Sequence, residues 1–144
     1  MSELRTIDTS DRPFGLPDLI TIVVDLPFPP SVNRIWRSNA RSVTLSPEYR
    51  RWKDSADMLT IASRVYRRMG HISGSFEAYI ALNVDRGRGD IDNRIKAVMD
   101  WAQSRSLIAN DKHCRRLTVE WVDHANAPDG CRLTLREMLR GTAA

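Results

Sequence analysis

The sequence predicts an α+β fold: a single domain with one mixed β-sheet and two main helices, in the order β-β-α-β-α-β-β. Short runs of alternating apolar residues indicate strands, and two longer runs with apolar residues three and four positions apart indicate helices. The strands and helices do not alternate regularly, so an α+β arrangement with a mixed sheet is expected. The 144 residues suffice for one domain with a buried core.

The first strand is expected at residues 19–26, where Ile and Val alternate with other residues before the prolines of 27–30 end it. Residues 1–18 are polar and contain two prolines and a glycine, which predicts a flexible leader ahead of a folded domain that spans 19–140. A second, short strand is expected at 43–45, after a possible turn in 37–42.

The first helix is expected from Pro47 to about residue 69, with Ser46 as its N-cap. The second helix follows the acidic residues near position 92, with Asp92 or Asn93 as its N-cap. Each helix carries one apolar stripe that predicts its buried face: Tyr49, Trp52, Ala56, Leu59, Ala62, Tyr66 and Met69 in the first, and Ile95, Val98, Met99 and Ala102 in the second.

Three further strands complete the predicted sheet. Residues 76–84 alternate strictly between apolar and other residues, which is typical of a half-buried strand. Residues 117–121 and 131–135 also alternate, and the segment 123–130 between them contains Pro-Asp-Gly. This segment predicts a hairpin loop that joins the last two strands.

Composition and charge narrow the classes of function. The chain is 42% hydrophobic and has no apolar run near the roughly 20 residues that span a membrane. It lacks the pattern of a signal peptide, and its two cysteines, Cys114 and Cys131, match no disulfide or zinc framework, so a cytoplasmic location is expected. Outside the first 25 residues the net charge is +7, carried mostly by arginine, which suits a nucleic-acid partner but does not require one.

The acidic segment that begins at Asp90 is the strongest candidate for a functional site. If the backbone there is extended, Asp90 and Asp92 point to one side, and Lys96, one helical turn later, can reach the same side. Asp111 follows the second helix and can return a third carboxylate. Three oxygen donors and one ammonium group form a candidate site for a divalent metal and a phosphate.

Magnesium is the metal that this set of residues favours. An EF-hand needs Gly and Glu where this chain has Ile95 and Trp101, and the histidines lack paired zinc spacing. His113 is a possible general base, although an ordinary surface histidine is the simpler interpretation. The chemistry that fits the predicted set of residues is metal-dependent hydrolysis of a phosphodiester.

At these residues the sequence resembles the RusA family of Holliday junction resolvases. The resemblance rests on the segments 26–34 (LPFPPSVNR) and 89–96 (GDIDNRIK) and on the interval from Asp90 to Asp111, and it covers roughly residues 20–138. It implies a small α+β subunit that works as a homodimer. It also implies an endonuclease that depends on Mg²⁺, or on Mn²⁺ in its place, and cuts a four-way DNA junction, commonly in the recombination and repair of phages or prophages.

The resemblance also implies roles for individual residues. Asp90, Asp92 and Asp111 match the metal-binding catalytic acids, and Lys96 matches the catalytic lysine. Two departures are visible: Asn110 stands where the family often has a second acid, and Gly87 and Gly89 dilute the basic run before Asp90. Six residues are expected to contact DNA: Asn33, Arg34, Arg37, Arg86, Arg88 and Arg94.

Other functions stay open at this point. The acids can be simple helix caps in a non-catalytic, basic DNA-binding module, or the metal site can serve other branched DNA or a small phosphodiester. Phe28, Ile35 and Trp36 are candidates for an exposed apolar dimer interface, with core packing as the alternative.

Overall fold

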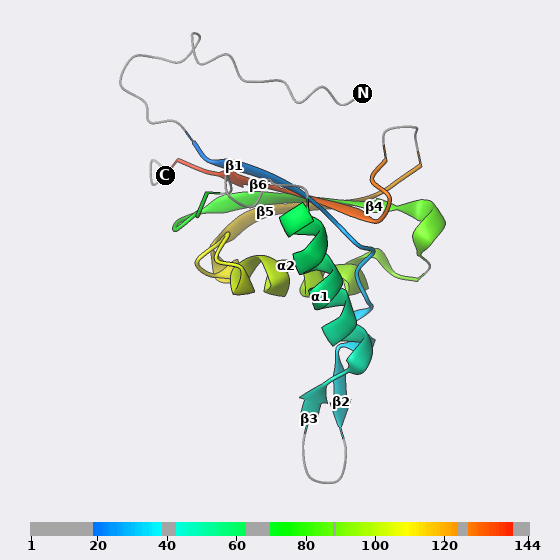
Figure 1. Ribbon diagram of the computed structural model, residues 1–144. Coiled ribbons are helices and arrows are strands. Elements are labelled where there is room, and N and C mark those ends of the chain that lie inside the picture. Colours follow the sequence, from blue (N-terminus) through cyan, green and yellow to red (C-terminus); the bar gives the residue numbers. More distant parts are fainter. Residues whose placement is uncertain (1–18, 39–42, 63–69, 88, 124–126, 140–144) are drawn as a thin grey trace.

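A four-stranded mixed sheet, covered on one face by two helices, forms the body of the protein in the computed structural model (Figure 1). The structure describes residues 19–38, 43–62, 70–87, 89–123 and 127–139, so the predicted leader 1–18 lies outside the described residues. The predicted fold class is confirmed, with one extra short strand. The elements are β1 (Thr21–Leu26), β2 (Trp36–Ser38), β3 (Val43–Leu45), α1 (Pro47–Ala62), β4 (Phe76–Asn83), α2 (Ile95–Ser104), β5 (Cys114–Val122) and β6 (Cys131–Glu137), with the short 3-10 helices η2 (Val32–Arg34), η4 (Val84–Arg86), η5 (Ile91–Arg94) and η6 (Asp111–His113).

The strand order in the sheet is β1-β6-β4-β5, with β4 and β5 parallel and the other neighbours antiparallel. The predicted hairpin over 123–130 is therefore wrong, because β4 lies between β5 and β6. Burial explains this order: Ile80, Ala81 and Leu82 are all buried, as suits a central strand, whereas Arg115 to Thr118 are exposed, as suits an edge.

The first helix begins as predicted. The Oγ of Ser46 accepts a hydrogen bond from the backbone N–H of Tyr49 at 3.1 Å. The buried stripe then runs through Tyr49, Trp52, Ala56 and Thr60. Leu59 is 43% exposed and Ala62 is exposed, so their predicted burial is wrong; a period of 3.6 residues places position 60 on the face of Ala56. Tyr66 and Met69 lie outside the described residues.

One carboxylate joins the two helices. Asp57 on α1 accepts hydrogen bonds from the indole N–H of Trp101 at 2.9 Å and from Nε of Arg105 at 2.6 Å, and it also forms an ion pair with Arg105. Trp101 itself is fully buried. Burial alone would raise the pKa of Asp57, but these hydrogen bonds outweigh it and lower the pKa. The group fixes the helices against each other beneath the sheet.

The β2–β3 hairpin projects from the N-terminal end of α1, away from the sheet (Figure 1). Its base is held by Ile35, which is 1% exposed, and by the hydrogen bond from the N–H of Ser46 to the carbonyl of Ile35 at 2.8 Å. The sequence predicts β3 but assigns Arg37 and Ser38 to a turn, and they belong to β2 instead. Of the described helices, none is long and apolar enough to cross a membrane.

Candidate functional site

The acids Asp90 and Asp92 lie at the junction between β4 and α2. Asp90 has an extended backbone (φ −78°, ψ 135°), but the next four residues wind into η5, so the fully extended geometry expected for this pair is wrong. The predicted N-cap is also wrong, because α2 begins at Ile95 without a side-chain cap. Both acids are exposed, and neither carboxylate bonds to another residue in the described part of the chain.

A cavity of about 630 Å³ opens beside Asp90. It gathers five of the residues that the sequence predicts for the site: Asn33, Arg34, Arg86, Asp90 and Arg94. Three arginines thus share the cavity wall with the carboxylate of Asp90, which favours an anionic ligand such as a phosphate. The complete lining consists of Phe28, Pro29, Pro30, Ser31, Asn33, Arg34, Glu48, Trp52, Arg86, Gly87, Gly89, Asp90, Asn93 and Arg94.

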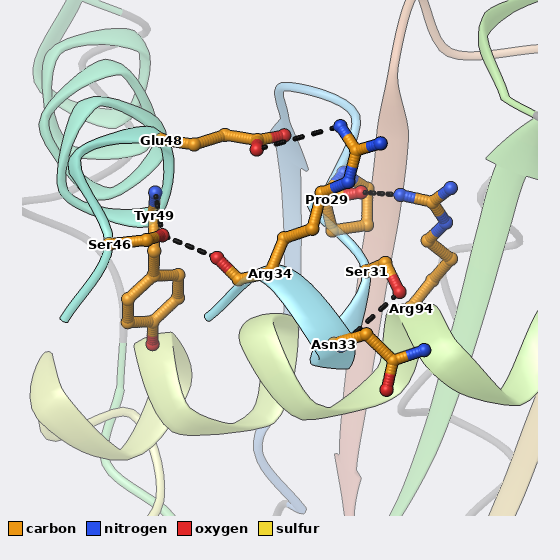
Figure 2. Close-up of polar contacts among 8 residues, drawn as sticks. All are labelled: Pro29, Ser31, Asn33, Arg34, Ser46, Glu48, Tyr49 and Arg94. Atoms are coloured by element: carbon orange, nitrogen blue, oxygen red, sulfur yellow. Dashed lines mark hydrogen bonds and ion pairs between the residues drawn. The ribbon is translucent and has the colours of Figure 1, made fainter. Parts of the chain in front are cut away.

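Arg94 is held firmly at the wall of this cavity. Its Nη1 donates to the carbonyl of Pro29 at 2.9 Å (Figure 2). Its guanidinium carbon also lies 5.0 Å from the centre of the Phe28 ring. That ring in turn stacks on Trp121 at 6.0 Å. Burial, and next the charge of Arg34, lower the pKa of Arg94. Both effects disfavour the charged form of Arg94, and an anion placed here would relieve them.

Arg34 reaches the cavity from η2. Its Nη1 lies 3.9 Å from an oxygen of Glu48, and its side chain is 72% exposed, so this ion pair contributes little to stability (Figure 2). The turn that presents it is fixed at its start, where the Oγ of Ser31 accepts the N–H of Asn33 at 3.3 Å. Asn33 is exposed at the same edge of the cavity. Arg34 can therefore leave Glu48 for a stronger anion.

Arg86 comes from η4, and its Nε donates to the carbonyl of Asp129 at 3.1 Å. Glycine is required at positions 87 and 89 for two different reasons. A Cβ on Gly87 would lie 1.9 Å from the Phe28 ring, so Gly87 makes room for that ring and not for a ligand. Gly89 has φ +97°, which a glycine adopts freely, and it turns the chain into Asp90.

Lys96 does not join Asp92 in the structure. Its Nζ forms an ion pair with Asp100 at 3.0 Å, one turn further along α2. This pair is half-exposed, and such pairs are worth about 0–1 kcal/mol, so the ammonium group can exchange Asp100 for a phosphate. The structure thus pairs Lys96 with the i, i+4 acid that follows it on the same helix, and a role for Lys96 beside Asp90 and Asp92 stays a prediction.

Asp111 lies at the opposite end of α2. Its backbone N–H donates to the side chain of Gln103 at 3.1 Å, and the helix rises about 12 Å between Ile95 and Gln103. In Figure 1 the yellow segment that contains η6 lies at the left of the sheet, and η4 and the start of α2 lie at the right. Across the described ranges, no three His, Cys, Asp or Glu side chains are placed to hold one metal ion. One chain therefore does not bring Asp111 to Asp90 and Asp92.

Among the lining residues without a predicted site role, Trp52 and Glu48 make contacts that shape the cavity wall. Trp52 is predicted only as core, but its indole N–H donates to the carbonyl of Pro27 at 3.0 Å and so fixes the proline segment beside the cavity. Glu48 is predicted only as a residue of the first helical turn, yet it is the acid that faces Arg34. The side chain of Arg37 and all of Arg88 fall outside what the structure describes.

The family model described as endodeoxyribonuclease RusA matches residues 27–134, which is most of the chain and includes the whole cavity lining. No curated protein matches the chain.

Proposed function

Because the chain belongs to the RusA family of endodeoxyribonucleases, we propose that it is a Mg²⁺-dependent, structure-specific nuclease that resolves four-way DNA junctions in recombination and repair. The observation that carries this proposal is the cavity that the exposed Asp90 lines together with Arg34, Arg86 and Arg94. A metal-binding acid beside several arginines suits a phosphodiester. We also propose that the protein is cytoplasmic and acts in the recombination and repair of a phage or prophage.

The carboxylates of Asp90 and Asp92 fit a hard divalent ion. Mg²⁺ typically binds one or two carboxylates and completes its shell with waters and phosphate oxygens, and both of these acids are exposed. When bound, Mg²⁺, or Mn²⁺ in its place, would supply an activated water and stabilise the leaving oxygen. Asp90 and Asp92 would hold the ion at the mouth of the cavity.

The basic residues would act on the phosphates. Arg34 and Arg94, whose charges already disfavour each other, gain most from an anion placed between them. Lys96 would leave Asp100 and offset the negative charge that develops at the phosphorus. Asn33 and Arg86 would position the DNA strand along the two rims of the cavity.

A second copy of the chain would bring Asp111 to the site. β5 is a nine-residue edge strand whose outer side pairs with no strand among the described residues, so another strand could pair with it. In the described chain, Asp111 lies before the first residue of β5, and η5 lies near its other end, where the Phe28 ring contacts both Arg94 and Trp121. Antiparallel pairing of β5 with its own copy exchanges these two ends.

The charges on β5 suit this pairing. A two-fold axis at Thr118 sets Arg116 opposite Glu120 of the partner subunit, and it sets the exposed Leu117 opposite the partner's Val119. It also carries Asp111 to the end of the sheet where the partner's Asp90 and the partner's Asp92 lie. A homodimer with two such sites would match the two-fold symmetry of a junction.

The direct test uses the purified protein with a synthetic four-way junction and a matched linear duplex, in Mg²⁺ or in EDTA. We expect paired symmetric cuts in the junction alone, and only with the metal. The variant Asp92→Asn should lose cleavage by about 10³-fold, because a metal ligand is removed, and should still bind the junction. Asp54→Asn, an exposed acid on α1, is the matched control and should cut like the wild type.

Other outcomes would replace the proposal. Cleavage by Asp92→Asn at the wild-type rate would show that the site is misassigned. Salt-sensitive binding without incision under any divalent metal would identify a non-catalytic DNA-binding module. Equal cutting of forks and flaps would broaden the substrate to other branched DNA. Turnover of a small phosphodiester without DNA cleavage would make it a small-molecule hydrolase.

A further inference from the structure

The β2–β3 hairpin presents a large aromatic side chain to solvent. Trp36 is 55% exposed, whereas Trp52 and Trp101 are buried and Trp121 is half-buried. The indole N–H groups of Trp52 and Trp101 each have a hydrogen-bond acceptor inside the fold. Trp36 thus stands apart from the other three tryptophans, because its ring contributes little to the core.

The position of Trp36 is fixed although its ring is exposed. The preceding residue, Ile35, is buried in the core, and Trp36 pairs with Leu45 in the hairpin. The guanidinium of Arg50 donates to the carbonyl of Leu45 at 3.0 and 3.3 Å, which ties the other strand to α1. The alternation of the strands places Trp36 on the same face as Val43, which is 63% exposed. The hairpin is therefore an anchored arm with an apolar face.

The charge around this arm points to a polyanion. The segment from Leu26 to Pro47 contains Arg34, Arg37 and Arg41 and no acidic residue. Arg34 lies two residues before Trp36 and lines the cavity that contains Asp90. The arm therefore continues from the rim of the proposed site, and a DNA strand bound there would pass beside Trp36.

We propose that Trp36 stacks on an unstacked base at the branch point of a DNA junction and so positions the strand for cleavage. This inference rests on the proposed function. The face of a base is available for stacking only where the base has left its neighbours, as it can at a branch point and not within an intact duplex. Trp36 would thereby favour branched DNA over linear DNA, while the arginines would bind phosphates of either.

The test measures binding in EDTA, where no cleavage occurs, with the full-length chain and 2-aminopurine at the branch point of a four-way junction. Trp36→Ala should weaken junction binding by about 5- to 100-fold and lose the 2-aminopurine signal, while duplex binding stays within about twofold. Trp36→Phe should keep most of the affinity, and Trp36→Leu should behave like Trp36→Ala, because leucine is apolar but cannot stack.

Two results would overturn the inference. Wild-type junction binding by Trp36→Leu would show that the arm needs only an apolar side chain. A shift of Trp36→Ala from dimer to monomer, measured by light scattering, would assign the arm to contact between two copies of the chain. Failure of the proposed nuclease site is distinguishable, since it would change cleavage in Mg²⁺ and leave the binding in EDTA unaltered.

Discussion

Two acidic residues of this protein, Asp57 and Asp90, both lie close to arginine, but in opposite situations. Asp57 is half-buried between the helices and accepts hydrogen bonds from Trp101 and Arg105. Asp90 is exposed and its carboxylate bonds to no other described residue, although Arg34, Arg86 and Arg94 line the same cavity. Asp57 thus accepts the hydrogen bonds that its neighbours donate, whereas the arginines near Asp90 bind backbone carbonyls or Glu48 instead.

This difference assigns Asp57 to the stability of the fold and Asp90 to the binding of a ligand. A carboxylate that is already fully bonded has little left for a ligand, and its removal would damage the fold. A carboxylate without partners contributes little to the fold and keeps its oxygens for a metal. We therefore expect substitutions at Asp57 to change stability and substitutions around Asp90 to change binding and catalysis.

Replacement of Asp57 should have the largest effect on stability. Asp57→Ala leaves the indole N–H of Trp101 and the guanidinium of Arg105 without this acceptor, and it should lower the free energy of unfolding by about 1–3 kcal/mol in urea denaturation. Junction cleavage below the unfolding temperature should stay near the wild-type rate. Equal stability of Asp57→Ala and the control Asp54→Asn would contradict the structural role.

The pH dependence of this effect follows from the lowered pKa of Asp57 in the folded state. Above the ordinary pKa of about 3.9, the ionised group contributes its full stabilisation. As the pH falls through the lower folded value, the group is protonated and the contribution is lost. The stability difference between wild type and Asp57→Ala should therefore be constant near pH 7 and shrink as the pH falls below 4. A difference that grew in acid would have the wrong sign.

Replacement of Arg34 should have a smaller effect, and on DNA binding alone. Arg34→Gln removes one phosphate contact, so junction affinity in EDTA should fall by about 3- to 10-fold at 0.1 M salt, and the slope of log K against log salt should decrease by about 1. The free energy of unfolding should change by less than about 0.5 kcal/mol, because the ion pair with Glu48 is long and exposed. An unchanged salt slope would remove Arg34 from the interface.

Local sequence patterns predict the elements of this fold well, because each depends on neighbours in the chain. Ser46 and Pro47 define the start of α1, and alternation defines β4 and β6. The order of strands depends on long-range packing, and the Pro-Asp-Gly segment suggests a hairpin that β4 prevents by lying between β5 and β6. Similarly, the burial of Ile35 and the exposure of Trp36 depend on how the arm meets α1.

The candidate site shows the same division. The cluster of Asn33, Arg34, Arg86, Asp90 and Arg94 is predictable as a set of residue types, and the structure collects these five around one cavity. The position of Lys96 cannot be predicted in the same way, because whether it pairs with Asp92 or with Asp100 depends on where α2 begins. The separation of Asp111 from Asp90 and Asp92 cannot be predicted either, because the direction of α2 carries the chain to the far end of the sheet before Asp111 is reached.

We propose that Asp111 of one subunit joins Asp90 and Asp92 of another to hold the metal. The most direct test of this claim is nicking of a four-way junction by a heterodimer of Asp92→Asn and Asp111→Asn, co-expressed with two different tags and purified through both. Each homodimeric variant should be inactive, while the heterodimer should regain one intact site and nick one strand. An inactive heterodimer, beside an active wild-type dimer purified in the same way, would contradict the claim.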